Sequence, residues 1–154
     1  MTSQQEPQTV FERSIRALNE LDYDAFEALL TDDLTLEFPQ SGERFRGARN
    51  VRASFENYPG GLPASGLDMS EGKSVAPRPR STRTPTFTFV RAQDSGNVGT
   101  AAYKAHYPDR SVWWCVTFYE LRDGRIARLT TFFAPLFEAT DWRKPYVDSA
   151  GQRA

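Results

Sequence analysis

Few side chains of this chain could carry chemistry, and the first is its only histidine, His106. An imidazole exchanges protons close to neutral pH, so it could act as an acid or a base. On its expected strand it shares the more polar face with Lys104, whereas Tyr103 and Tyr107 lie on the opposite face. We therefore expect the imidazole outside the interior or near its rim, which favours a surface histidine over a catalytic one.

The only cysteine, Cys115, lies within an apolar run. A thiol in such a position is more often a small buried hydrophobic group than a nucleophile. One cysteine cannot form an internal disulfide, which fits a reducing cytoplasm. One histidine and one cysteine at no ligand-like spacing make a zinc site improbable, so we expect no metal and no cofactor.

Hydroxyl groups at alternate strand positions are the remaining polar candidates. Thr117 and Tyr119 share one face of the segment 111–121, and Tyr103 lies on the more apolar face of the preceding expected strand. Tyrosine and threonine hydroxyls can donate a hydrogen bond to a ligand carbonyl. We expect Tyr103 and Tyr119 to be the first donors to test.

The elements that must position these groups follow from hydrophobic periodicity, which predicts three helices with one strand among them and then a run of strands. The expected helices begin at Thr9, at Asp22 or Asp24, and at Gly47. The expected strands span 34–38 and about 86–92, 98–107, 111–121 and 125–134. The last four are joined by short turns, which require antiparallel pairing. The pattern predicts an α+β fold.

The same pattern predicts one domain over residues 9–147, with a disordered segment 1–8 and a flexible segment 148–154. Residues 62–85 have the composition of a loop, in which a short edge strand could lie. The basic tract 77–83 holds three arginines and no interleaved aromatic residue. It is typical of a solvated loop, and an anion or nucleic-acid contact is the alternative.

Three segments carry a resemblance to a known family: LNELDYDAFEALLTDDLTLEFP, FRGARNVRASFENYPGG and FYELRDGRIARLTTFFAPLFEATDWRKPYV. Their order and spacing resemble the NTF2-like superfamily, most closely its SnoaL-like branch. The resemblance implies a strongly curved antiparallel sheet that folds into a cone and is closed by three N-terminal helices. It also implies pairing through the outer face of the sheet and a small apolar ligand inside the cone.

Side chains that face the interior of such a cone would form a mostly apolar pocket with a few hydroxyls, which suits a small, flat, weakly polar molecule. The alternative is a packed core in which the aromatic side chains fill the cone. The candidate pocket residues are Ser14, Phe38, Phe55, Tyr58, Tyr103, Trp113, Thr117, Tyr119 and Phe133.

The catalytic residues of the related ketosteroid isomerases are not matched. Their carboxylate base aligns with Phe38, their tyrosine with Ser14 and their protonated aspartate with Thr117. Phe38 cannot accept a proton, so this mechanism is rejected. A two-histidine site like that of scytalone dehydratase is impossible with a single histidine. Neither the Asp-Arg-Asp set of the epoxide hydrolases nor the inner aspartate of the polyketide cyclases has a convincing candidate.

The segment 111–121 is apolar on both faces, so something must cover each face. Burial of Trp114, Val116 and Phe118 is worth roughly 1.5–3 kcal/mol per side chain, and such a patch is unusual on a monomer. We predict a homodimer through this outer face. The alternative is that the C-terminal segment 137–146 folds over it. Trp142 is expected to anchor the tail on the body.

Composition limits the remaining possibilities. The chain of 154 residues has a net charge of −1, which gives no long-range attraction to nucleic acid. No window approaches ~18 apolar residues, and the N-terminus lacks an export signal, so we expect a cytoplasmic protein with no membrane partner. The function alternatives are a cofactor-independent isomerase, cyclase or dehydratase, a non-catalytic ligand-binding or dimerisation module, and a scaffold partner in a larger assembly.

Overall fold

The computed structural model describes residues 8–59, 67–68, 73–74 and 84–148. Its helices are α1 (Val10–Glu20), α2 (Tyr23–Ala28), α3 (Ala48–Glu56) and the 3₁₀-helix η2 (Asp141–Tyr146). Its strands are β1 (Leu30–Phe38), β2 (Glu43–Arg46), β3 (Leu67–Asp68), β4 (Lys73–Ser74), β5 (Thr86–Ser95), β6 (Val98–His106), β7 (Val112–Arg122) and β8 (Arg125–Pro135). The predictions for residues 1–7, 77–83 and 149–154 lie outside the described residues.

Helix α1 forms where its periodicity predicts it. The Thr9 side chain caps it by accepting from the Glu12 backbone N–H at 3.1 Å. The helix ends at Leu21, which takes the left-handed conformation (φ 59°) and donates its N–H back to the last turn. Its apolar stripe, including Phe11 and Ile15, is buried.

Helix α2 is shorter than expected, and Asp22, not Asp24, is its cap. Asp22 accepts from the Ala25 N–H at 2.9 Å. Asp24 and Glu27 instead accept from the Arg52 guanidinium of α3, at 2.6 and 2.8 Å. These ion pairs join the two helices.

The main sheet has six strands in the order β2-β1-β8-β7-β6-β5. The antiparallel pairing of β5 to β8 confirms the prediction for that part of the chain. The expectation of a wholly antiparallel sheet was wrong, because β1 runs parallel to β8, with Leu36 opposite Leu129. Short turns dictate only the direction of strands that are neighbours in the sequence, and β1 and β8 are far apart in the chain.

Two further strand regions were not predicted at their positions. The polar segment Glu43–Arg46 forms β2, which pairs with β1 at one edge of the sheet. An edge strand can be polar because one side faces solvent, so hydrophobic periodicity does not reveal it. Strands β3 and β4 pair only with each other, so neither is an edge strand of the main sheet.

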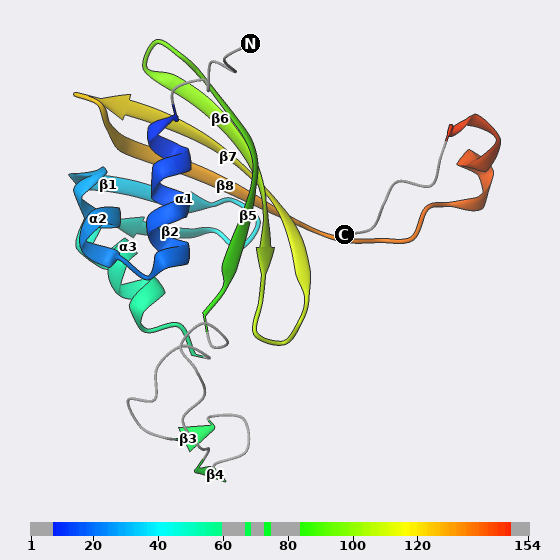
Figure 1. Cartoon of the computed structure of the whole chain (residues 1–154), viewed down its shortest axis with the longest axis horizontal. Coiled ribbons are helices and arrows are strands. Elements are labelled where there is room, and N and C mark those ends of the chain that lie inside the picture. Colours follow the sequence, from blue (N-terminus) through cyan, green and yellow to red (C-terminus); the bar gives the residue numbers. More distant parts are fainter. Residues whose placement is uncertain (1–7, 60–66, 69–72, 75–83, 149–154) are drawn as a thin grey trace, which may run out of the picture.

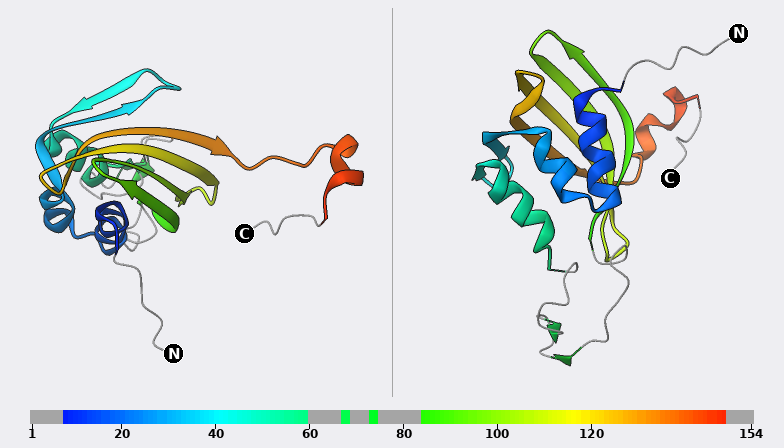
Figure 2. Two further views of the ribbon diagram at one scale, coloured as in Figure 1. Left: turned by 90° about the horizontal axis from the view of Figure 1, so that it is seen from above. Right: turned by 60° about the vertical axis from the view of Figure 1, so that its left-hand side comes forward.

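The helices α1, α2 and α3 lie on one face of the sheet, and the strands curve over them (Figures 1 and 2). The sheet is open, with β2 and β5 as its edges. Phe11 of α1 stacks on Tyr119 at 5.2 Å and contacts Tyr103 at 5.5 Å between ring centroids. The buried core extends between the three helices and the inner face of the sheet, and it also includes Val51 of α3 and Leu34 of β1. No helix in the described ranges is long and apolar enough to cross a membrane.

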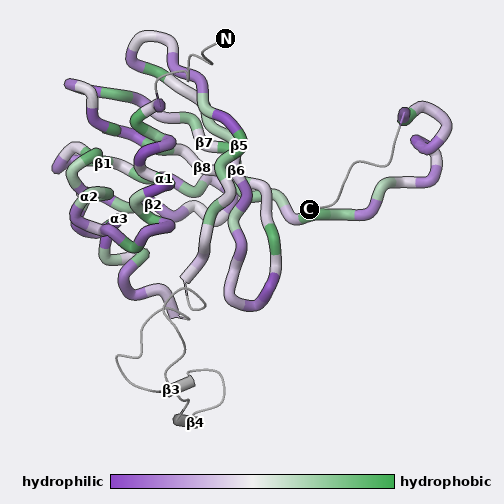
Figure 3. The backbone as a smooth tube through the Cα atoms, viewed as in Figure 1, coloured by the Kyte–Doolittle hydropathy of each residue, from purple (hydrophilic) through white to green (hydrophobic). Residues whose placement is uncertain are grey.

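The C-terminal segment does not fold back on the sheet. After β8 it runs away from the body and ends in η2 (Figure 1), with an apolar stretch followed by hydrophilic positions (Figure 3). The Trp142 side chain is 70% exposed, so the prediction that it anchors the tail on its own body was wrong. Arg143 does lie over its ring, at 5.3 Å.

Candidate functional site

A cavity of about 430 Å³ lies between the three helices and the inner face of the sheet. This volume is within the range of pockets that hold small organic molecules. Most of its wall is apolar or aromatic, and the polar groups that face it come from β2, β6, β7, β8 and the helices. Its lining includes Phe11, Phe26, Phe45, Phe55, Phe87, Ser14, Ser54, Tyr103, Thr117 and Thr131.

The structure places seven of the nine candidate pocket residues around this cavity. They are Ser14, Phe38, Phe55, Tyr58, Tyr103, Thr117 and Phe133. Trp113 lies at an adjoining, more open pocket of about 540 Å³. Tyr119 lines neither of the two. Binding of a ligand by these residues stays a prediction.

Tyr119 is the residue that the structure moves out of the predicted site. Its side chain is buried, but its hydroxyl donates to the Asp94 carboxylate. Its ring covers Gly99, where any Cβ would overlap the phenol. Alternation along β7 correctly predicted that Tyr119 points inward. It could not show that the ring would lie over Gly99 of the neighbouring strand, which has no side chain to occupy that space.

Three buried hydroxyls form a chain at the inner wall of the cavity. The Tyr103 hydroxyl lies 3.2 Å from Thr117 Oγ1, which lies 2.8 Å from Thr131 Oγ1. Neighbouring strands place them in register, because Thr117 pairs with Thr131. Burial raises the pKa of the Tyr103 phenol, so it stays protonated and able to donate at neutral pH. Thr131 was not among the predicted residues, although its alternation along β8 was a usable signal.

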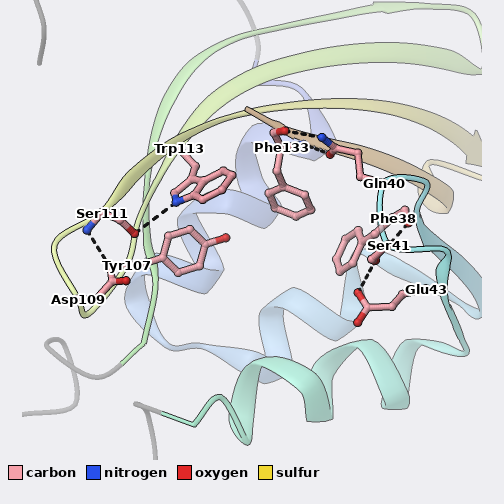
Figure 4. Close-up of a pocket in the computed structure, with 9 residues that line it drawn as sticks. All are labelled: Phe38, Gln40, Ser41, Glu43, Tyr107, Asp109, Ser111, Trp113 and Phe133. Carbon is pink, nitrogen blue, oxygen red and sulfur yellow. Dashed lines mark hydrogen bonds between the residues drawn. The ribbon is translucent and has the colours of Figure 1, made fainter. Parts of the chain in front are cut away.

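The entrance side of the cavity is shared with the more open pocket (Figure 4). Phe38, Glu43, Tyr107 and Phe133 line both spaces. The Glu43 carboxylate accepts from the Ser41 hydroxyl at 2.9 Å. Burial is also the main cause that raises the pKa of the Tyr107 phenol to about 12. Glu43 and Tyr107 are the polar residues common to both spaces.

Sequence reasoning missed both entrance residues, for different reasons. Glu43 lies between the strand expected over 34–38 and the helix expected from Gly47, where no element was predicted, and β2 places it at the cavity. Tyr107 follows the last residue of β6, where its N–H donates to the Ser111 carbonyl at 2.9 Å. It belonged to the apolar face of the expected strand, and that parity was the available signal.

The walls near the entrance are held by hydrogen bonds. The Gln40 side chain donates to the Phe133 carbonyl at 2.7 Å and accepts from its N–H at 2.6 Å (Figure 4). The Trp113 indole N–H donates to Ser111 Oγ at 3.3 Å. These bonds restrict groups that would otherwise move more freely, so the entrance is partly preorganised.

Among the described residues that line the inner cavity, Glu43 is the only carboxylate. His106 is on the helix-free side of the sheet, and its ring nitrogen lies 2.9 Å from the Thr88 hydroxyl. Burial raises the pKa of the Cys115 thiol to about 12, which makes it a poor nucleophile. The part of the chain that the structure describes has no group of three or more potential metal ligands.

The family model of the SnoaL-like domain matches residues 11–129, most of the folded body described above. This chain belongs to the SnoaL-like family. A search of curated protein sequences finds no match.

Solved structures agree with this SnoaL-like assignment. An NTF2-like protein of unknown function from Burkholderia xenovorans is 26% identical, with a TM-score of 0.71 over 92% of this chain and 93% of that chain. A putative ketosteroid isomerase from Kribbella flavida is 22% identical, with a TM-score of 0.69 over 93% and 88% of the two chains. An LEH-like epoxide hydrolase from M. tuberculosis is 21% identical, with a TM-score of 0.57 over 80% and 79%. The latter two show the fold alone.

One position of this SnoaL-like chain links the comparison to the geometry. In the resemblance described above Phe38 aligns with the base of the isomerases, and in the structure it lines the cavity without any group that could take a proton. Glu43 of β2 is its direct partner in the sheet register. The Glu43 carboxylate therefore lies on the strand next to Phe38, where it lines the same cavity.

Proposed function

We propose that this SnoaL-like protein binds a small, largely apolar organic molecule that carries one carbonyl or hydroxyl group. The curved sheet and helices α1, α2 and α3 would form a cone around it. The observation that carries this proposal is the buried chain of Tyr103, Thr117 and Thr131 on an otherwise apolar wall.

The hydroxyl chain has a donor to spare. Its three hydroxyls bring three hydrogens, and the two bonds within the chain use two of them. The third O–H takes part in neither of these bonds and would donate to a ligand oxygen. In a buried, apolar site such a bond favours a ligand with an acceptor over one of the same shape without it, because the unpaired hydroxyl is otherwise costly.

Thermal-shift screening tests the binding proposal. Small ketones, steroids, terpenoids and aromatic polyketides are compared with hydrocarbons of the same shape. We expect a carbonyl compound to raise the Tm and its hydrocarbon counterpart to do so less. A screen in which hydrocarbons stabilise as well as ketones would contradict a role for the hydroxyl chain.

Two tyrosine variants make a matched pair for the best compound of that screen. Tyr103→Phe removes a hydroxyl that faces the cavity, and we expect its Kd to rise by about tenfold, the worth of one hydrogen bond. Tyr119→Phe removes a buried hydroxyl that lies on Asp94, and its Kd should stay within about twofold. Equal effects in isothermal titration would contradict the assignment of the two phenols.

The second candidate function is catalysis of a proton transfer, as in an isomerase, cyclase or dehydratase. It is favoured by Glu43, whose carboxylate lines the inner cavity at its entrance. A carboxylate can remove a proton from the carbon next to a ligand carbonyl, if that carbon lies within hydrogen-bonding distance. The donor to that carbonyl would be the hydroxyl chain on the inner wall.

Deuterium exchange separates catalysis from simple binding. The bound ketone is incubated in D₂O, and exchange at the carbon next to its carbonyl is followed by NMR. An enzyme would accelerate this exchange, Glu43→Gln would slow it at least about 100-fold, and Glu120→Gln on the opposite face of the sheet would not change it. Binding without accelerated exchange would leave a non-catalytic ligand-binding module as the function.

A further inference from the structure

The large apolar side chains that are exposed among the described residues fall into two groups. The first group follows β8, on a segment that we call the arm, residues 136–148: Leu136, Phe137, Trp142, Tyr146 and Val147. The second group lies on the strands β5 to β8: Val90, Val98, Val116, Phe118 and Phe132. Alternation and register place Val98, Val116, Phe118 and Phe132 on the helix-free side of the sheet, which we call the outer face. Val90 lies at the irregularity of β5, where the register gives it no partner.

The arm is shaped by bonds among its own residues. Lys144 pairs with Asp141 at 2.6 Å, and Arg143 lies over the Trp142 ring. The arm leaves the body in the direction of β8, after Pro135, and contains no glycine that would favour a sharp reversal of the chain. Tyr146 is 82% exposed, so the body of the same chain does not cover this segment.

The outer face carries an apolar patch on β7 and β8. Val116 and Phe132 are direct partners in the register of β7 and β8, and Phe118 meets the Phe132 ring edge-on at 6.2 Å. Trp114 extends the patch, half-buried under the Lys104 ammonium at 5.0 Å. Contiguous apolar patches on a sheet face commonly mark contact surfaces, so this face has the character of an interface.

The two surfaces differ in charge as well as in position. The outward positions of β5 to β8 in this patch hold three basic residues and one acidic residue: Arg91, Lys104, Arg128 and Glu120. The arm holds three acidic and two basic residues: Glu138, Asp141, Asp148, Arg143 and Lys144. A net basic face and a net acidic arm favour contact between them over contact of either with itself.

We propose that two copies of this chain exchange their arms, so that each arm lies on the outer face of the other copy. This exchange would complete the homodimer expected from Trp114, Val116 and Phe118. A two-fold arrangement makes the arm-to-face contact twice and covers both exposed groups at once, whereas a single contact would leave one arm and one face free to recruit further copies. The inference does not depend on what the cavity binds.

Cross-linking between two variants tests the exchange. Trp142→Cys and Phe118→Cys proteins are purified separately, mixed and treated with a short bismaleimide. The native Cys115 is buried and does not compete. We expect a covalent dimer that contains one copy of each variant. As the control, Trp142→Cys mixed with Arg13→Cys, an exposed position on the helix side, should not cross-link.

Three outcomes would overturn the proposal. One is equal cross-linking to Arg13→Cys and Phe118→Cys. Another is a product of monomer mass from the double variant Trp142→Cys, Phe118→Cys, since it would mean that the arm folds onto its own sheet. The third is a wild-type protein that light scattering finds to be monomeric at concentrations of tens of micromolar.

Truncation provides a second measurement. Removal of residues 136–154 leaves every strand of the main sheet in place. We expect this variant to fold with the wild-type circular dichroism signature but to dissociate at concentrations at least about tenfold higher than those at which the full chain dissociates, in line with the loss of apolar anchors. A truncated protein that stays dimeric with unchanged affinity would show that the arms are not exchanged.

Discussion

Tyr103 and Tyr119 are both buried phenols on the inner face of neighbouring strands, yet they lie in different surroundings. Tyr103 belongs to a chain of neutral hydroxyls at the wall of a cavity, whereas Tyr119 fills the space over Gly99 and donates to a carboxylate. The difference arises from what stands on the neighbouring strand: a side chain of ordinary size in one case and a glycine in the other. Alternation along the strand determines which face of the sheet a tyrosine points to. The neighbouring side chains determine whether its ring fills the available space or borders a cavity.

The largest effect on stability is expected from a change next to Tyr119. Gly99→Ala places a Cβ within the ring of Tyr119, so the ring must move against Phe11 or the strands must separate. Overpacking of this kind costs about 1–3 kcal/mol of the free energy of unfolding. Urea denaturation measures it, with Thr100→Ala on the outer face as the control. An unchanged urea midpoint would show that Tyr119 has another place to go.

The next effect is expected in the hydroxyl chain. Thr117→Val keeps the volume but removes the central hydroxyl, which leaves the hydroxyls of Tyr103 and Thr131 without the group that links them. We expect a loss of about 1–2 kcal/mol in the free energy of unfolding, because two buried hydroxyls lose a partner. The double variant Thr117→Val, Tyr103→Phe should recover part of this loss. If the two losses simply added, the three groups would not act as a chain.

A smaller effect on stability is expected from Tyr119→Phe. The Asp94 carboxylate that loses its donor lies in an exposed residue, so water replaces the phenol at little cost. We expect a loss below about 1 kcal/mol in the free energy of unfolding. Thermal denaturation next to Tyr103→Phe makes the comparison direct, and a greater loss than that of Gly99→Ala would reverse the expected ranking of the two variants.

The smallest effects are expected from pH, and they have opposite signs at two carboxylates. Burial raises the pKa of Asp94, so its contribution to stability is present at low pH and is lost as the pH rises through the raised value. The Arg122 guanidinium lowers the pKa of Asp33, so that contribution is present at neutral pH and is lost as the pH falls. Melting curves between about pH 3 and pH 7 should show a steeper gain of stability with pH for Asp94→Asn than for the wild type, and a shallower gain for Asp33→Asn. Parallel curves for all three proteins would contradict both shifts.

Most of the fold could be predicted because its signals are local. The stripe of α1, the Thr9 cap and the turns between β5 and β8 each depend on residues close together in the chain. Strand β2 was not predicted, because an edge strand needs no apolar alternation. The parallel pairing of β1 with β8 was not predicted, because it joins segments that are far apart in the sequence.

The candidate site was predictable to a smaller degree. Inward-facing residues such as Thr117 and Phe133 were found by parity, and they do line the cavity. Glu43 was missed because only the register of β2 on β1 brings it beside Phe38. The tail was expected to dock on its own body, yet it projects from it. An exposed tryptophan indicates that Trp142 would favour a contact, but the sequence does not show which surface makes that contact.

The sequence by itself determined the order of the elements, the inner and outer face of each long strand, and the absence of a base at Phe38. These properties depend on residue type and on the period of the backbone, which are both written in the linear chain. Only the tertiary structure decided that Tyr119 lies on Gly99, that Glu43 reaches the cavity and that the arm stands free. Each of these features depends on how segments that are distant in sequence are placed relative to one another, which is set by the register of the strands in the folded sheet.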